Sequence, residues 1–235
     1  MEAAHPAVLE PSAGWPLRTA RQLWHGDRWD RAWAVLVAWA VASSVLFMLI
    51  GGLGMGGFVL SFGLLFGGLA WKYRRSVRPL MARVRLDNLA GFVLLALVVP
   101  ALEETLCWGL GNTVAMPVLW KDILFCAAVW LPWFLCWRFF LSKRYRFTEK
   151  EALLLAASTG LLYEFAGKPG VFSNPLGLFL VAPLIVVVYA AIFIIPMQLI
   201  DFSGAKDGPS KYLVAPVLPY LLSWPAAVLF LVVVH

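Results

Sequence analysis

The sequence predicts an all-α fold, a polytopic transmembrane bundle of about seven spans. Of its 235 residues, 62% are hydrophobic and only 14% are charged. The mean hydropathy is +0.82, and the few charges divide the apolar residues into blocks long enough to cross a bilayer. A soluble domain carries about 25% charged residues. The composition therefore excludes a soluble globular protein, and also a disordered chain, a collagen-like repeat and a disulfide scaffold.

The first span is preceded by an N-terminal segment, residues 1–31, which we expect to be cytoplasmic or to lie as an amphipathic helix in the headgroup layer. It has no apolar core of its own, so the first span acts as the membrane anchor. Residues 32–234 form the transmembrane domain. The expected spans are about 32–50, 57–71, 88–110, 123–141, 149–166, 176–200 and 212–234.

The first two spans come from one uncharged run of 40 residues between Arg31 and Lys72. As a helix this run would extend roughly 60 Å, against a hydrocarbon core of about 30 Å. The glycine-dense stretch 51–57 is where a tight turn can form. We therefore predict a hairpin of two spans.

The third block runs from Asn88 to Trp120 and is about 50 Å long as a helix, too long for one span and too short for two. Gly109, Gly111 and Pro117 mark where it should break. We predict a span to about residue 110, followed by a re-entrant or interfacial piece over 111–120. Backbone of that kind is tolerated at membrane depth only where protein or water covers it.

The last four spans are bounded by charges. The fourth span, about 123–141, lies between charged residues. The fifth span begins with a capping box, in which Thr148 precedes Glu151 by three residues. No charge lies between Lys168 and Asp201, or between Lys211 and the C-terminus. These uncharged runs predict the sixth and seventh spans.

Charge distribution predicts the orientation. With the N-terminus inside, alternation over seven spans places all of the 19 Lys and Arg residues on the inner side except Lys121 and Lys168. We therefore expect an integral membrane protein, in the plasma membrane, whose partners are the lipid bilayer, anionic headgroups on the cytoplasmic side and other membrane proteins. The net charge of +6 is explained by these juxtamembrane cations, so no nucleic-acid partner is predicted.

Adjacent Glu103 and Glu104 are the first candidate site residues, because ionisable groups inside a span are costly and commonly functional. Two neighbouring carboxylates in low dielectric do not both ionise easily, so one is expected to keep a proton and serve as donor or water-activating base. Side chains of neighbouring residues point about 100° apart on a helix. One of the two is therefore expected to face the bundle centre, and the other a neighbouring helix or the lipid headgroups.

Glu164 is the third candidate. Glu103 and Glu164 each lie 15 residues from the inner end of their spans, at a depth of about 22 Å. The two carboxyl groups could therefore meet. The alternative is an ion pair with Lys168, which follows Glu164 at i+4.

The segment Pro100-Ala101-Leu102-Glu103-Glu104-Thr105-Leu106-Cys107-Trp108-Gly109 resembles the first motif of the CAAX-processing and bacteriocin-immunity intramembrane endopeptidases, Pro-x-x-Glu-Glu-x-x-x-Arg-Gly. In that family, paired glutamates and later histidines activate a water for peptide hydrolysis. Trp108 replaces the motif's Arg, and Glu164 stands where the family's second motif has His. The resemblance implies a diverged or inactive member, or one that uses Glu164 in place of histidine.

No metal site is predicted, because the chain has no His/Cys ligand spacing and no H-E-x-x-H motif. The cofactor, if any, is unknown. Cys107, at i+4 from Glu103, is expected to be an inert thiol.

Three functions remain open. The first is an intramembrane hydrolase-like protein centred on Glu103, Glu104 and Glu164. The second is a proton- or cation-coupled transporter that uses the same carboxylates. The third is a non-catalytic subunit of a membrane complex.

Overall fold

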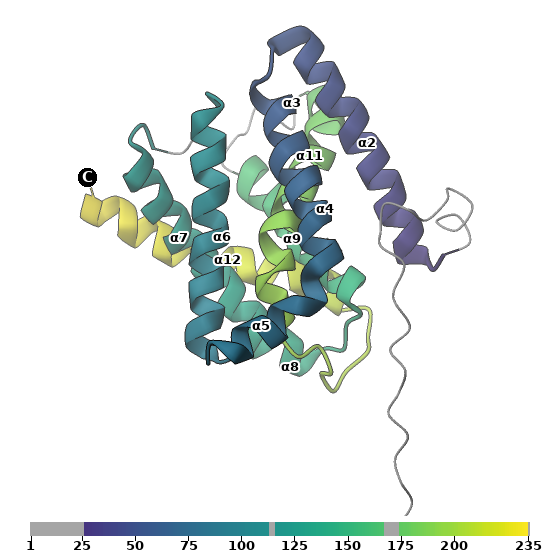
Figure 1. Cartoon of the computed structure of the whole chain (residues 1–235), viewed down its shortest axis with the longest axis vertical. Coiled ribbons are helices and arrows are strands. Elements are labelled where there is room, and N and C mark those ends of the chain that lie inside the picture. Colours follow the sequence, from purple (N-terminus) through teal and green to yellow (C-terminus); the bar gives the residue numbers. More distant parts are fainter. Residues whose placement is uncertain (1–25, 113–115, 167–173, 235) are drawn as a thin grey trace, which may run out of the picture.

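The structure is a computed structural model of the chain, and it describes residues 26–112, 116–166 and 174–234. These residues form a bundle of long helices (Figure 1) and contain no strand, only isolated bridges between loops at one end. The predicted all-α polytopic bundle is confirmed. Most of the predicted N-terminal segment, residues 1–31, lies outside the described residues.

The predicted hairpin of spans one and two is present. Helix α2, Arg28–Gly51, begins four residues before the expected start because Asp27 caps it. The Asp27 carboxylate accepts hydrogen bonds at 2.8 Å from the backbone N–H groups of Trp29 and Asp30. The helix ends in the glycine-dense stretch, where Gly52 has φ of 79°.

The second span is longer than the predicted 57–71. It is continuous over Gly54–Arg83, through α3 (Gly54–Phe58), η1 (Val59–Phe66), α4 (Gly67–Tyr73), η2 (Arg74–Ser76) and α5 (Val77–Arg83). Helix therefore continues through residues 72–83, beyond the predicted end of the span at residue 71. The one proline of this basic stretch, Pro79, lies in the first turn of α5, where the missing N–H is tolerated, and the helix ends before Arg85, which has φ of 58°.

Helix α6, Leu89–Gly109, matches the predicted third span to within one residue, and the predicted break follows it at Gly111, with φ of +72°. The predicted re-entrant or interfacial piece over 111–120 stays a prediction, because residues 113–115 lie outside the described residues and no membrane position is given for the rest. Residues 111–112 and 116–118 form no helix, and 119–120 belong to the next span. That span is α7 (Leu119–Cys136), which continues through η3 (Trp137–Leu141) and α8 (Ser142–Arg144). It starts four residues earlier than expected, which places Asp122 inside it.

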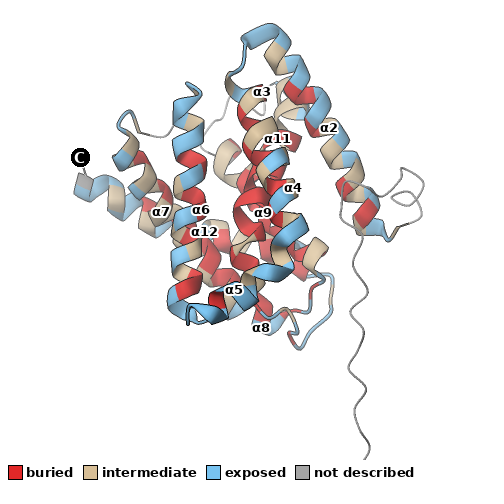
Figure 2. Cartoon of the chain, in the orientation of Figure 1, coloured by how far each residue is buried: buried red, intermediate tan, exposed pale blue. Residues whose placement is uncertain are grey.

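Helix α9, Glu149–Ala166, has the predicted bounds and the predicted capping box. The backbone N–H of Glu151 donates to Thr148 Oγ1, and the backbone N–H of Thr148 donates to Glu151 Oε2, each at 3.3 Å. The helix is largely buried at the centre of the bundle (Figure 2), against α11 (Pro175–Ile194) and α12 (Lys211–Val234). A short helix, η4 (Pro196–Leu199), follows α11.

Within the described part of the chain, six helices are long and apolar enough to cross a membrane, and α9 is not one of them. The six are Arg28–Gly51, Gly54–Arg83, Leu89–Gly109, Leu119–Arg144, Pro175–Ile194 and Lys211–Val233. Helix α9 carries four charged side chains in 18 residues. Because other helices surround it, these charges need not face lipid. The protein is thus a multi-pass membrane protein with a polar helix at its centre.

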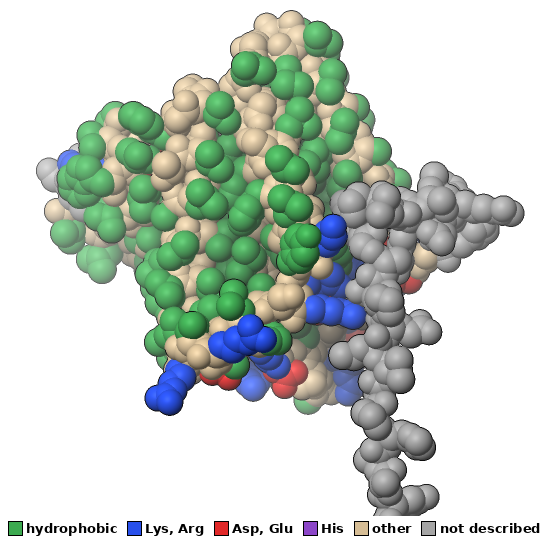
Figure 3. All heavy atoms as spheres, viewed as in Figure 1, with side chains coloured by type: hydrophobic (Ala, Val, Ile, Leu, Met, Phe, Trp, Pro, Cys, Tyr) green, Lys and Arg blue, Asp and Glu red, His purple; other side chains and the backbone are tan. Residues whose placement is uncertain are grey.

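The basic side chains gather at one end of the bundle, and hydrophobic side chains cover the face above it (Figure 3). Ion pairs join the helix ends that meet there. Lys150 Nζ lies 2.8 Å from Asp30 Oδ2 and 3.1 Å from Asp27 Oδ2. Burial opposes ionisation of Asp27, but hydrogen bonds from Asp30 N–H and Lys150 outweigh it, so the pKa of Asp27 is lowered.

Candidate functional site

A cavity of about 790 Å³ lies between the helices, within the range of small-molecule sites. Glu103 and Glu104 from α6 and Glu164 from α9 all line it. The structure therefore brings the three predicted site residues to one place. None of the described lining residues is Lys, Arg or His.

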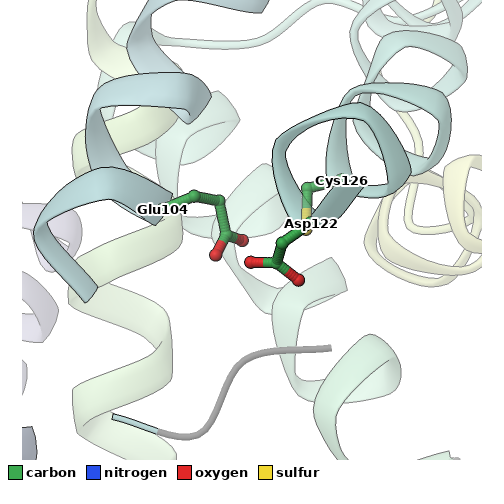
Figure 4. Close-up of side chains that lie close together, drawn as sticks. All are labelled: Glu104, Asp122 and Cys126. Atoms are coloured by element: carbon green, nitrogen blue, oxygen red, sulfur yellow. The ribbon is translucent and has the colours of Figure 1, made fainter. Parts of the chain in front are cut away.

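Both glutamates of α6 point inward. Glu103 is 6% exposed and Glu104 is 8% exposed, so of the two alternatives expected for the second glutamate, a neighbouring helix or the lipid headgroups, the structure has the neighbouring helix. Glu104 faces α7 (Figure 4). Glu103 Oε2 is buried and has no hydrogen-bond partner among the described residues. Such a group needs a partner, which a substrate or a water can supply.

Glu164 is held by a tyrosine of α11. Tyr189 Oη donates a hydrogen bond to Glu164 Oε1 at 3.3 Å. Lys168, the alternative ion-pair partner, lies outside the described residues, so that alternative is untested. The tyrosine orients the carboxylate from a position that is itself nearly fully buried.

Aromatic side chains from several helices complete the cavity wall. The Tyr189 ring stacks on Tyr163, with ring centroids 6.1 Å apart, and meets Trp130 edge-on at 6.0 Å. Tyr163 Oη lies 2.6 Å from Ser223 Oγ, which links α9 to α12. These rings leave a rigid, mostly apolar chamber around a few polar groups, the usual composition of a ligand cavity.

Asp122 and Cys126 on α7 are site residues that the sequence prediction missed. One ligand atom from each of Glu104, Asp122 and Cys126 lies within 4.8 Å of the others, and all three residues are buried (Figure 4). The sequence signal was their i, i+4 spacing, which places both on one helix face. It went unused because the fourth span was expected to start at residue 123. This cluster is also a possible set of metal ligands, although no metal site was predicted.

Chemically, the cavity offers carboxyl groups as acids and bases, a thiol and tyrosine hydroxyls, in surroundings closed largely by apolar side chains. Cys107 also lines it, but no histidine lies among the described residues to activate a thiol. Comparison of the chain with family models, with curated proteins and with solved structures finds no match. The ten-residue resemblance to the CAAX-processing endopeptidases is therefore left untested.

Proposed function

We propose that this protein is an intramembrane hydrolase, a diverged relative of the CAAX-processing and bacteriocin-immunity endopeptidases that uses Glu164 where they use histidine. One observation carries the proposal: carboxyl groups from two helices far apart in sequence line a single cavity inside the bundle. A purely structural subunit has no need to hold three carboxyl groups around an open volume. Their burial has a cost that function has to justify.

In the proposed reaction, Glu103 is the general base. Its carboxylate takes a proton from a water molecule, and the resulting hydroxide attacks the carbonyl carbon of an amide or ester. Glu104, which carries a proton beside the buried Asp122 carboxyl group, donates a hydrogen bond to the carbonyl oxygen as negative charge develops on it. Glu103 then returns its proton to the leaving nitrogen or oxygen, and the scissile bond breaks to give a carboxylic acid and an amine or alcohol.

The lining defines the substrate class. Apolar and aromatic side chains dominate the wall, and lipid surrounds the bundle, so the substrate is a hydrophobic peptide segment or an acylated chain that enters from the membrane. Glu164, oriented by Tyr189, accepts a hydrogen bond from a substrate N–H on the α9 side of the chamber.

The test is hydrolysis of a quenched fluorescent transmembrane peptide and of a fluorogenic long-chain ester by protein reconstituted in nanodiscs. The double variant Glu103→Gln/Glu104→Gln should lose at least about 100-fold in rate, because both the base and the proton donor are removed. Glu149→Gln is the matched control. It makes the same carboxyl-to-amide change on α9, but at the basic end, where Glu149 pairs with Arg74.

Heavy-oxygen water identifies the reaction, because hydrolysis places the label in the new carboxyl group. An unchanged rate in the double variant that inserts and purifies normally would refute the proposal. Cleavage without incorporation of the label would refute it as well.

The proposal includes orientation and surroundings. The basic end lies in the cytoplasm, against the anionic headgroups of the plasma membrane, since short cytoplasmic loops retain Lys and Arg. The N-terminus is then inside, and the carboxylate cavity lies in the half of the membrane away from the basic end.

A second candidate is a proton-coupled carrier of a cation. It is favoured by a cavity that combines three glutamates with aromatic ring faces and has no described Lys or Arg in its wall. In proteoliposomes, tetraphenylphosphonium uptake should then depend on a pH gradient and be lost in Glu103→Gln but kept in Glu149→Gln. Uptake that ignores both the gradient and Glu103→Gln would remove this candidate.

A further inference from the structure

The second feature of the cavity wall is the cluster of Glu104, Asp122 and Cys126, which offers two carboxylate oxygens and one sulfur (Figure 4). Asp122 and Cys126 are one helical turn apart on α7, and Glu104 reaches them from α6. Two of the three, Glu104 and Cys126, line the cavity, whereas Asp122 lies behind them and is fully buried.

Asp122 separates this cluster from an ordinary group of acidic residues. Its Oδ1 accepts a hydrogen bond from the backbone N–H of Met116 at 2.8 Å. Its Oδ2 is buried and has no hydrogen-bond partner among the described residues, while the carboxyl group points toward Glu104. Lys121 is next in the chain, but its ammonium lies over the Trp120 ring, 5.8 Å from the centroid.

A bound cation would give the buried Asp122 Oδ2 the partner that it lacks among the described residues. Burying carboxylates without a cation costs several kcal/mol per ion as an order of magnitude, so either protons or a metal ion must compensate. A thiol beside two carboxylates suits a divalent ion of intermediate softness better than Mg²⁺ or Ca²⁺, which take oxygen ligands. The Met116 N–H fixes the orientation of the Asp122 carboxylate, as hydrogen bonds outside the ligand set commonly do around metals.

We propose that Glu104, Asp122 and Cys126 bind one zinc-like divalent transition-metal ion at the cavity wall. Three protein ligands leave one coordination position open, as in catalytic zinc sites, and here that position faces the cavity. On binding, the S–H bond of Cys126 breaks, its proton leaves to the medium and a sulfur–metal bond forms. Glu103, adjacent to a ligand but not one of the three, keeps its unpartnered oxygen free to act on a metal-held water.

This inference deepens the proposed hydrolase and rests on it only for the ion's role. The ion would take the place of the proton that Glu104 carries in the proposed reaction, polarise the substrate carbonyl and make the water at its open position easier to deprotonate.

The test uses Co²⁺ with the metal-stripped full-length protein in nanodiscs. A Co²⁺–thiolate bond gives a near-ultraviolet charge-transfer absorption that oxygen ligands do not. Wild-type protein should bind one Co²⁺ per chain with this absorption, and Zn²⁺ should displace it. Cys126→Ser should abolish the band, whereas Cys107→Ser and Cys136→Ser, changes at the other two free cysteines, should keep it.

Asp122→Asn preserves the shape of the side chain and should weaken Co²⁺ binding by more than about tenfold. Asp122→Asn keeps the test decisive even if Cys126→Ser misfolds. Correct folding of Asp122→Asn is checked by comparing its elution profile and its unfolding temperature with those of the wild-type protein. The metal site is overturned if wild-type protein shows no thiolate band, if the band survives Cys126→Ser, or if Asp122→Asn binds Co²⁺ as tightly as wild type.

The two proposals can fail separately. If the protein shows the Cys126-dependent Co²⁺ band but cleaves neither probe, the metal site stands and the hydrolase proposal is refuted. If the wild-type protein cleaves the peptide at full rate in the presence of a chelator, and the Cys126→Ser variant cleaves it at the same rate, the hydrolase proposal stands and the metal site is refuted.

Discussion

At the scale of single residues, Gly160 on α9 decides how closely the Tyr189 ring can approach. A Cβ at this position would overlap the ring atoms of Tyr189. The absence of a side chain therefore lets the tyrosine lie against α9, from which its hydroxyl reaches Glu164. The glycine is as much part of the site as the residues that carry chemistry.

Gly160→Ala should destabilise the protein by about 1–3 kcal/mol, because the added methyl group must displace a buried aromatic ring. The midpoint of thermal unfolding in detergent measures this. Gly68→Ala is the control, since a Cβ there meets nothing within 4 Å and alanine favours the helix. Equal unfolding temperatures for the two variants would show that the ring is not constrained.

Asp27 predicts a pH dependence. Its pKa in the folded protein is lowered from 3.8 by hydrogen bonds that outweigh the effect of burial. Its stabilising contribution is therefore complete above the unfolded value of 3.8 and is lost as the pH falls through the folded pKa. The difference in unfolding temperature between wild type and Asp27→Asn should shrink on acidification below that value. A constant difference down to lower pH would contradict the prediction.

The candidate residues show what a sequence pattern can and cannot find. Glu103, Glu104 and Glu164 could be predicted because a charge inside an apolar run is conspicuous. Asp122 could not, because it stands beside Lys121 at the edge of a run, where charges normally face water. Only the packing of α7 against α6 turns it toward Glu104.

At the scale of elements, α9 is a polar helix whose first turn is fixed by ion pairs. Glu149 pairs with Arg74 at 3.0 Å and Lys150 with Asp30 at 2.8 Å. Lys211 Nζ lies 2.9 Å from Glu151 Oε1, and both side chains are at most 5% exposed. These contacts attach α9 to three other elements at the basic end of the bundle.

Lys211→Met should destabilise the protein by about 3–5 kcal/mol, because it leaves the buried carboxylate of Glu151 without its cation. Denaturant unfolding in detergent measures the loss. Glu149→Gln, which breaks a half-exposed pair, should cost at most about 1 kcal/mol. The double variant Lys211→Met/Glu151→Leu should recover much of the loss, and a double variant less stable than Lys211→Met would contradict this account.

Two helices are longer than the sequence predicted, and both differences have the same cause. The second span continues through the basic residues 72–83, and α7 begins at residue 119. The prediction ended spans at charges, but a helix ends where its backbone hydrogen bonding ends. Lys and Arg are good helix formers, so a charged stretch can prolong a helix beyond the membrane.

At the scale of the whole molecule, charge is distributed along the bundle axis. On the face that Figure 3 shows, most Lys and Arg side chains gather at the basic end, and hydrophobic side chains cover the surface above it. The linear sequence predicted this partition from loop charges alone. Antiparallel packing of successive helices brings those loops together.

Cysteine labelling of intact cells tests the proposed orientation. In a background with Cys107, Cys126 and Cys136 changed to serine, a membrane-impermeant maleimide should label Val118→Cys without permeabilisation. It should label Asp87→Cys, at the basic end, only after permeabilisation. Both positions are exposed in the structure. The reverse pattern would place the basic end outside.

The sequence by itself determined that this chain is a helical membrane protein, where most of its helices lie and which three carboxylates are unusual. These properties follow from composition, glycine breaks and the free-energy cost of charge in lipid, all of which are local along the chain. Only the tertiary structure decided that α9 lies at the centre, that Tyr189 holds Glu164, and that Asp122 and Cys126 join Glu104. Contacts between helices depend on which faces meet, and that choice is made by packing across the bundle rather than by neighbours in sequence.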